Sequence, residues 1–246
     1  MQINLLGARV DVVDLAGAVE RIAGFVQSGI PHQVVTLNPE ILYRAQREPA
    51  LLSLINGADL VTADGVGVVW AAKVAGTPLP ERVTGIDLML ALVARAAAEG
   101  WRVFLLGASP GVAEEAARRL QEKHPGLLVA GTMHGYFPPA GEPEVVEMIR
   151  TARPHLLFVG LGAPKQEQFI ARYKQALGVS AAMGVGGSFD VIAGKVARAP
   201  AWMRRMHLEW LGRLIREPRR FKRMLVLPRF AWLAWRKARS GRCGRR

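Results

Sequence analysis

Residues 60–67 read LVTADGVG, an apolar run that stops at an aspartate and passes two glycines before the apolar segment 68–74. A short apolar run that ends at Gly, Asn or Asp is typical of a strand, and the segment after it has the length of a helix. Comparable runs at 34–37, 103–106, 156–159 and 181–185 also end at Gly, Asn or Ser. This alternation predicts an α/β fold: a mostly parallel, Rossmann-like sheet flanked by helices.

Length and cysteine content limit the class of protein. The chain has 246 residues, enough for one domain with an appendage. Its single cysteine, Cys243, excludes an internal disulfide and a cysteine-based zinc site. The first residues lack a basic segment and reach Arg9 and Asp11 before any long apolar run, so we expect no signal peptide and a cytoplasmic protein.

The net charge of +13 lies in the last part of the chain. Residues 201–246 hold 15 of the 33 Lys and Arg residues, two acidic residues and four of the six tryptophans. Residues 1–200 are balanced, with 18 basic and 18 acidic residues. We therefore expect an α/β body at 1–200 and a basic, Trp-rich helical appendage at 201–246. Such a composition suits an anionic membrane surface or a single-stranded nucleic acid.

The appendage has a helical pattern that is interrupted at Pro218 and Pro228, which predicts about three short helices. Its most apolar window, 224–235, is twelve residues long, whereas a spanning helix needs about twenty. We therefore expect peripheral attachment to the inner face of the cell membrane. Arginines 213, 216, 220 and 223 recur at spacings that place them on one side of a helix, unless Pro218 bends it.

Polar and small residues follow the strands. Ligands of open α/β sheets bind beyond the carboxyl ends of the strands, so we expect these residues to face one crevice. They are Thr36, Asn38, Asp64, Gly107, Ser109, Gln166 and Asp190. Glycines at helix starts let backbone N–H groups approach an anion, and phosphate is the obvious candidate.

Other cofactor classes fit poorly. Gly107 and Gly111 form only a broken G-x-G-x-x-G fingerprint, and residues 127–131 lack the acid that would bind a ribose of NAD. A Walker A loop is absent, and the five histidines are scattered. We expect no tightly bound metal or cofactor. An NAD-linked enzyme and a nucleotide-binding module with a nucleic-acid-binding tail remain the rival hypotheses.

Taken together, these segments resemble the WecG/TagA/CpsF family of glycosyltransferases, from residue 1 to about 230. The matching stretches are 36–40 (TLNPE), 63–67 (ADGVG), 82–87 (RVTGID), 104–108 (FLLGA), 134–137 (HGYF), 160–167 (GLGAPKQE) and 186–190 (GGSFD). The basic tail continues the resemblance through Arg198, Trp202, Trp210 and Arg219.

The resemblance implies a membrane-associated, inverting, metal-independent glycosyltransferase. Such an enzyme moves a sugar from a UDP-sugar to a polyprenyl-diphosphate-linked acceptor. Well-known members transfer N-acetylmannosamine or its uronic acid for teichoic acid or enterobacterial common antigen, and others act in exopolysaccharide synthesis. The partners it implies are therefore a UDP-sugar, a lipid-linked acceptor and an anionic membrane, with no nucleic acid; a homo-oligomer is also possible.

Asp64 is the expected catalytic base, as in the family pattern, because it ends an apolar strand beside two glycines. An Asx turn or helix cap is the structural alternative. Thr36, Asn38 and Gln166 are expected to bind sugar, although Asn38 also suits a helix cap and Gln166 a solvated first turn. Arg82 is expected to pair with the diphosphate, or else to be solvated like most loop arginines.

The remaining expected contacts concern the nucleotide and the diphosphate. Tyr136 and Asp190 are the candidates for uridine, and residues 107–109 for phosphate or ribose. The nucleotide-contact candidates are Gly107, Ala108, Ser109, Tyr136, Gly162 and Asp190. Arg213, Arg220 and Arg223 are expected to close over the crevice and bind diphosphate, while the alternative is a solvated basic face.

Overall fold

Six parallel strands form the central sheet of the computed structural model, which describes residues 1–200, 203, 206 and 225–239. Their order is β4-β3-β8-β7-β5-β6, and every neighbouring pair is parallel. The strands are β3 (His32–Leu37), β4 (Leu60–Ala63), β5 (Arg102–Gly107), β6 (Leu128–Met133), β7 (Leu156–Gly160) and β8 (Ala181–Gly184). The expected parallel α/β sheet is therefore confirmed.

A separate hairpin of β1 (Gln2–Leu5) and β2 (Ala8–Asp11) lies beside β4. Asp11, only 1% exposed, joins the two parts. Its Oδ2 accepts a hydrogen bond from the backbone N–H of Val61 (2.9 Å), and its Oδ1 pairs with Arg21 at 2.9 Å. The buried carboxylate is thus fully partnered, as a buried charge must be.

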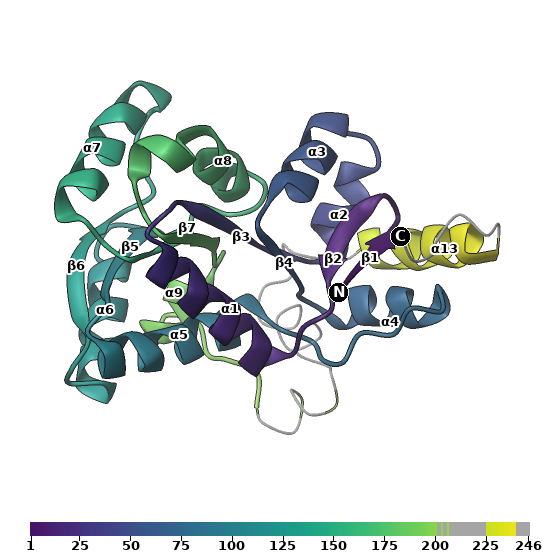
Figure 1. The fold of residues 1–246 in the computed structure, drawn as a ribbon, viewed down its shortest axis with the longest axis horizontal. Coiled ribbons are helices and arrows are strands. Elements are labelled where there is room, and N and C mark those ends of the chain that lie inside the picture. The colour runs from purple at the N-terminus through teal and green to yellow at the C-terminus, as the bar shows by residue number, and fades with distance from the viewer. Residues whose placement is uncertain (201–202, 204–205, 207–224, 240–246) are drawn as a thin grey trace.

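Helices cover both faces of the sheet, which makes three layers (Figure 1). One face is covered by α1 (Leu15–Ser28), α5 (Gly85–Glu99), α6 (Val112–Lys123) and α9 (Ser188–Ile192). The other face is covered by α2 (Pro39–Ala45), α3 (Pro49–Gly57), α4 (Val66–Val74), α7 (Glu142–Ala152) and α8 (Lys165–Leu177). A 3-10 turn, η1 (Pro139–Gly141), precedes α7.

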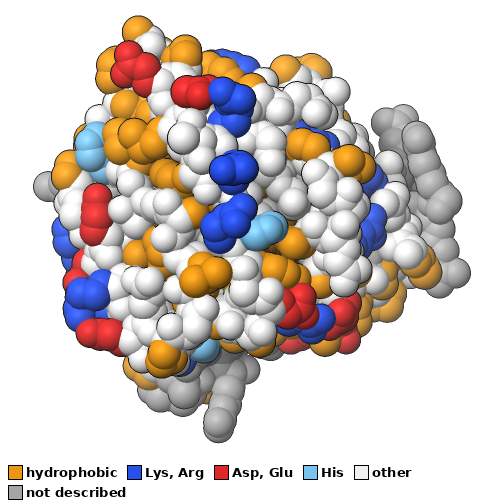
Figure 2. All heavy atoms as spheres, turned by 60° about the vertical axis from the view of Figure 1, so that its left-hand side comes forward, with side chains coloured by type: hydrophobic (Ala, Val, Ile, Leu, Met, Phe, Trp, Pro, Cys, Tyr) orange, Lys and Arg blue, Asp and Glu red, His pale blue; other side chains and the backbone are white. Residues whose placement is uncertain are grey.

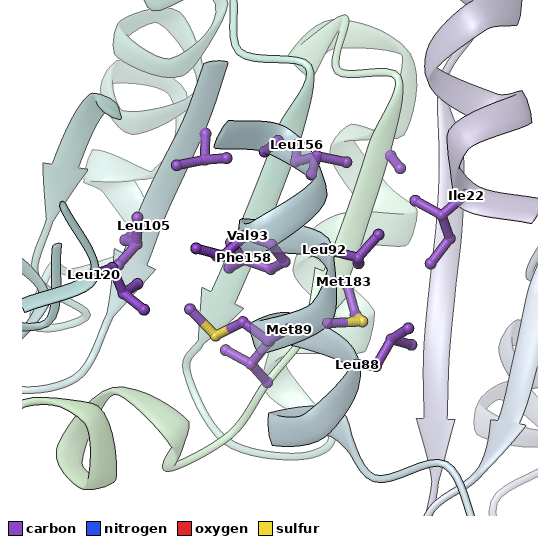
Figure 3. Close-up of a cluster of buried hydrophobic side chains, with 14 of the residues drawn as sticks. Ile22, Leu88, Met89, Leu92, Val93, Leu105, Leu120, Leu156, Phe158 and Met183 are labelled. Atoms are coloured by element: carbon purple, nitrogen blue, oxygen red, sulfur yellow. The ribbon is translucent and has the colours of Figure 1, made fainter. Parts of the chain in front are cut away.

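The core follows the two-residue alternation of the strands. On β5, Leu105 faces the α5 side with Phe158 and Met89, whereas Phe104 and Leu106 face α7 and α8. Figure 3 shows the first cluster, in which side chains from α5 lie over those of β5, β7 and β8. Both faces of each central strand are buried, which explains why these strands are continuous apolar runs in the sequence.

Helix α13 (Val226–Arg239) lies in the expected appendage. It packs against α2 and α4 through Phe230 and Ala234, which are 1% and 3% exposed. The Nζ of Lys237 donates a hydrogen bond to Oε1 of Gln46, one residue after α2 (2.8 Å). The other expected appendage helices lie outside the described residues.

The sequence predicts that the helical pattern is interrupted at Pro228. Pro228 is the third residue of α13, which begins at Val226 directly after a turn at Leu225, while residues 207–224 lie outside the described residues. The first turn of a helix has no intrahelical acceptor for its N–H groups, so proline costs little there. Pro218 lies outside the described residues.

Acidic and basic side chains lie side by side at several places on the face drawn in Figure 2. Arg118 pairs with Glu115 on α6, and Arg150 pairs with Glu147 on α7. This mixture fits the charge balance of residues 1–200. Among the helices that the structure describes, none has the length and hydropathy needed to cross a membrane.

Candidate functional site

A cavity of about 1240 Å³ opens where the carboxyl ends of the strands meet α2, α4 and α13. Ten of the expected site residues line it. They are Thr36, Asn38, Asp64, Arg82, Ala108, Ser109, Tyr136, Gly162, Gln166 and Asp190. A typical small-molecule pocket measures 300–1,000 Å³, so this cavity has room for more than one small ligand.

Asp64 follows β4 directly and is half-buried on the cavity wall. Its backbone N–H donates to the carbonyl of Leu37, which extends the pairing of β4 with β3 by one residue (2.8 Å). Its Oδ2 accepts a hydrogen bond from the N–H of Gly85, the first residue of α5 (3.1 Å). The N-cap of α4 is Gly65, so Asp64 is not at the cap position that the structural alternative gave it.

Thr36 and Asp64 each bring a side-chain oxygen close to Gly85. Thr36 is 5% exposed, and its hydroxyl donates to the carbonyl of Gly184 on β8 (3.3 Å). A Cβ on Gly85 would lie 3.3 Å from the Thr36 hydroxyl oxygen and 3.7 Å from Oδ2 of Asp64. Glycine therefore lets the start of α5 approach both groups, and a side chain there would fill the space beside them.

Gln166 is buried rather than solvated, with 3% of its surface exposed. Its Oε1 accepts from the N–H of Gly186 (3.0 Å), and its Nε2 donates to Oε1 of Glu167 (2.8 Å). A Cβ on Gly184 would lie 2.4 Å from Nε2 of Gln166, so a side chain there would displace the Gln166 amide. The Gln166 amide is thus held in one orientation at the cavity wall.

Glu167, which supports Gln166, is itself 1% exposed. Burial raises the pKa of its carboxyl above the ordinary value, and the hydrogen bond from Gln166 only partly opposes this. Its second oxygen, Oε2, has no hydrogen-bond partner among the described residues. A buried carboxyl of this kind is costly to keep in the charged form.

Asn38 is a helix cap, as its structural alternative predicts. Its Oδ1 accepts from the N–H of Ile41 (2.9 Å), and Pro39 occupies the first position of α2. It also lines the cavity, so capping and ligand contact are compatible.

Gly107 does not line the cavity, in contrast to its predicted contact with phosphate or ribose. It is buried at the end of β5, where a Cβ would lie 2.5 Å from the carbonyl carbon and oxygen of Gly160. Its φ of +136° also favours glycine. The residue serves the close approach of β5 and β7, while its neighbours Ala108 and Ser109 reach the cavity.

Among the described residues, Arg82 and Lys165 are the cations that border the cavity. Arg82 is half-buried rather than fully solvated, and Lys165, which the sequence analysis did not select, is exposed at the start of α8. A lysine at a helix N-terminus opposes the helix dipole, which is unfavourable. The position of Lys165 at the start of a predicted helix could therefore have indicated a functional residue. Tyr136 stands at the rim with 72% of its surface exposed.

The segment after Arg82 is fixed by a hydrogen-bonded acid. Thr84 caps α5, its hydroxyl lies 2.6 Å from Oδ2 of Asp87, and Arg198 pairs with Oδ1 at 2.7 Å. Burial would raise the pKa of the Asp87 carboxyl, but the hydrogen bonds from Thr84 and Arg198 outweigh it and hold the pKa below 3.8. Arg198 thereby ties the last residues of the body to the start of α5.

An apolar wall faces these polar groups and was not anticipated from the sequence. It consists of Val66 and Trp70 of α4 with Leu227, Phe230 and Ala231 of α13. Arg213, Arg220 and Arg223, the expected diphosphate ligands, lie outside the described residues. Within the part of the chain that is described, no three His, Cys, Asp or Glu side chains group as metal ligands.

Comparison with known proteins gives one family. The model of the glycosyl transferase WecG/TagA/CpsF family matches residues 3–244. A Bacillus spizizenii protein is 40% identical over 197 residues, which cover 80% of this chain and 76% of the relative. A Staphylococcus aureus protein (strain MW2) is 36% identical over 233 residues, 94% of this chain and 91% of the relative.

Both relatives are named N-acetylglucosaminyldiphosphoundecaprenol N-acetyl-beta-D-mannosaminyltransferase. The family model covers nearly the whole chain, including the body with its cavity and helix α13. The chain therefore belongs to the WecG/TagA/CpsF family of glycosyltransferases.

Proposed function

We propose that this protein is an inverting glycosyltransferase. It would transfer N-acetylmannosamine or a related hexose from a UDP-sugar to a polyprenyl-diphosphate-linked acceptor that ends in N-acetylglucosamine. The names of the two relatives support the sugar and the acceptor. The observation that carries the proposal is the half-buried carboxylate of Asp64 on the wall of a cavity of about 1240 Å³ that Thr36 and Gln166 also line.

The reaction needs one base. Asp64 would take the proton from the acceptor hydroxyl while that oxygen attacks the anomeric carbon from the face opposite UDP. The new carbon–oxygen bond forms as the bond between the anomeric carbon and the phosphate oxygen breaks, and UDP leaves with the electron pair. The N–H of Gly85 holds Oδ2 of this carboxylate at the cavity wall.

Sugar and nucleotide would occupy different walls. Thr36, Asn38 and Gln166 present a hydroxyl and two amides to sugar hydroxyls on the β3 and α8 side. Residues 108 and 109, Tyr136 and Asp190 follow β5, β6 and β8 and line the same cavity, and they would contact the nucleotide. Tyr136 offers a ring on which uracil could stack.

The charge that develops on UDP must be stabilised. Arg82 and Lys165 are the described cations on the cavity wall, and a guanidinium can hold diphosphate through paired hydrogen bonds. Arg213, Arg220 and Arg223 remain proposed ligands of the same group. Together these cations would do the work of a divalent metal, so no tightly bound cofactor is proposed.

The outer face of α13 suits a membrane surface. Trp232 and Trp235 are 56% and 45% exposed, and Arg236 and Arg239 stack over their rings at 5.0 and 4.6 Å. Indole rings favour the headgroup region, and arginines there attract anionic lipid. We therefore propose peripheral attachment to the cytoplasmic face, in cell-surface polysaccharide or teichoic acid synthesis.

A panel of UDP-sugars with a short-chain GlcNAc-diphosphoprenol tests the function. We expect one UDP-sugar to give both UDP release and a lipid product heavier by one sugar residue. NAD should give no thermal stabilisation, whereas UDP should raise the unfolding temperature. Gel shift with single-stranded DNA or RNA at physiological salt tests the nucleic-acid hypothesis. Absence of product with every UDP-sugar would contradict the proposal.

A further inference from the structure

The cavity has an apolar side that the sugar chemistry does not use. Val66 and Trp70 are 38% and 39% exposed, although both line the cavity. They are four residues apart on α4 and so share one face of the helix. Leu227 and Ala231, four apart on α13, line the same cavity. We call these four residues the apolar strip.

The apolar strip lies on two packed helices rather than on a loop. A Cβ on Gly67 would lie 2.7 Å from Cγ of Pro39 and 3.7 Å from Cε1 of Phe230, so glycine allows α4 to pack closely on α2 and α13. Phe230, which is 1% exposed, anchors α13 against the body. The two helices therefore hold the strip at a fixed place beside Asp64 and Gly65, which line the same cavity.

We propose that the apolar strip binds the first isoprene units of the lipid acceptor. This inference rests on the proposed function. The polar wall around Asp64 accounts for sugars and diphosphate but offers nothing to a hydrocarbon chain. An exposed apolar surface that continues into a polar cavity fits a ligand with a polar head and an apolar tail. A prenyl diphosphate sugar has this construction.

The position of the strip also gives the direction of the acceptor. The head group would lie near Asp64, and the prenyl chain would run along the apolar strip on the surfaces of α4 and α13. Contact with the strip would remove apolar surface of both partners from water, which favours binding. The strip would thus distinguish a prenyl-linked acceptor from a free sugar phosphate.

The test compares two acceptors in detergent-free solution, GlcNAc-diphosphate carrying either a methyl or a farnesyl group. For the unaltered protein we expect the farnesyl acceptor to have the higher kcat/KM. In Trp70→Gln and in Val66→Ser, the farnesyl-to-methyl ratio of kcat/KM should fall, by about tenfold for Trp70→Gln, the factor that 1.4 kcal/mol produces. Met148→Gln, a change at an exposed residue outside the cavity, should leave the ratio unaltered.

A binding measurement separates this inference from the proposed function. Calorimetry should show tighter binding of farnesyl diphosphate than of inorganic diphosphate, and Trp70→Gln should reduce the difference, whether or not transfer occurs. An unchanged ratio and unchanged farnesyl binding would overturn the inference. So would loss of sedimentation with anionic liposomes in Trp70→Gln without any change in the ratio, because the strip would then contact the bilayer itself.

Discussion

The carboxylate of Asp64 is tied to the first backbone N–H of α5 by a hydrogen bond of 3.1 Å from Gly85 to Oδ2. The end of strand β4 and the start of α5 therefore meet at a single acidic group. Because Gly85 has no side chain, this contact coexists with the nearby hydroxyl of Thr36. The geometry of the site therefore depends on the close approach of the α5 backbone to Asp64 and Thr36 as much as on the polar residues themselves.

Glu167 should act by positioning Gln166. Glu167→Gln keeps an oxygen that can accept from Nε2 of Gln166, whereas Glu167→Met removes the acceptor at similar volume. We expect Glu167→Met to raise the KM for the UDP-sugar roughly tenfold and Glu167→Gln to restore it to within about twofold. Steady-state kinetics check this, with thermal unfolding as the control for folding. An unchanged KM in folded Glu167→Met would show that Gln166 needs no such support.

Gly107 should be far less replaceable than Gly111. Both have positive φ, +136° and +80°, but only at Gly107 would a Cβ meet backbone, 2.5 Å from Gly160. Positive φ alone costs of order 1–3 kcal/mol, and overpacking adds a similar amount. Gly107→Ala should therefore lower the free energy of unfolding in urea by at least about 2 kcal/mol more than Gly111→Ala. Equal losses would refute the close packing of β5 against β7.

Asp87 should stabilise the fold in a pH-dependent way. Its pKa is lowered from 3.8, so the native state favours the charged form. The stabilisation is present above pH 3.8 and is lost as the pH falls below this value towards the native pKa. The difference in unfolding free energy between the unaltered protein and Asp87→Asn should shrink as urea titrations move from pH 6 to pH 3. A constant difference would contradict the role of Arg198 and Thr84.

Phe230 should hold α13 to the body. Truncation of a buried Phe to Ala typically costs 3–5 kcal/mol, and here the loss would fall on one helix rather than on the whole sheet. In Phe230→Ala, backbone amides of residues 226–239 should exchange hydrogen faster than in the unaltered protein, with the sheet unaffected. Trp235→Ala, at a side chain that is 45% exposed, is the matched control. If these amides exchanged as slowly in Phe230→Ala as in the unaltered protein, contacts other than Phe230 would hold α13 to the body.

Strands that end in polar residues made the sheet and the cavity predictable. Parallel strands bring their carboxyl ends to one edge, so Thr36, Asp64 and Asp190 could be placed together without knowing the strand order. The hairpin of β1 and β2 gave no such signal. Its turn has positive φ at Leu6 and Gly7. Hairpin turns of this kind usually contain Asn-Gly or Gly-Gly, and leucine is rare there, so the sequence Leu-Gly did not predict a turn.

The parts of the site that could not be predicted depend on tertiary contacts. The apolar strip exists only because α13 folds back onto α2 and α4, and no local pattern specifies that contact. Gly107 was predicted to contact phosphate because it lies between the end of a strand and the start of a helix, yet its backbone is used to approach Gly160.

The most direct test of the account is Asp64→Asn. Asparagine keeps an oxygen that can accept the hydrogen bond from Gly85, but it cannot take a proton from the acceptor hydroxyl. Asp14→Asn is the matched control, because Asp14 caps α1 outside the cavity and asparagine caps equally well. With the UDP-sugar that the panel selects and GlcNAc-diphosphoprenol, Asp64→Asn should bind UDP normally and lose turnover by a factor of about 100 to 10,000. Normal turnover in Asp64→Asn would remove this carboxylate from the mechanism and contradict the account.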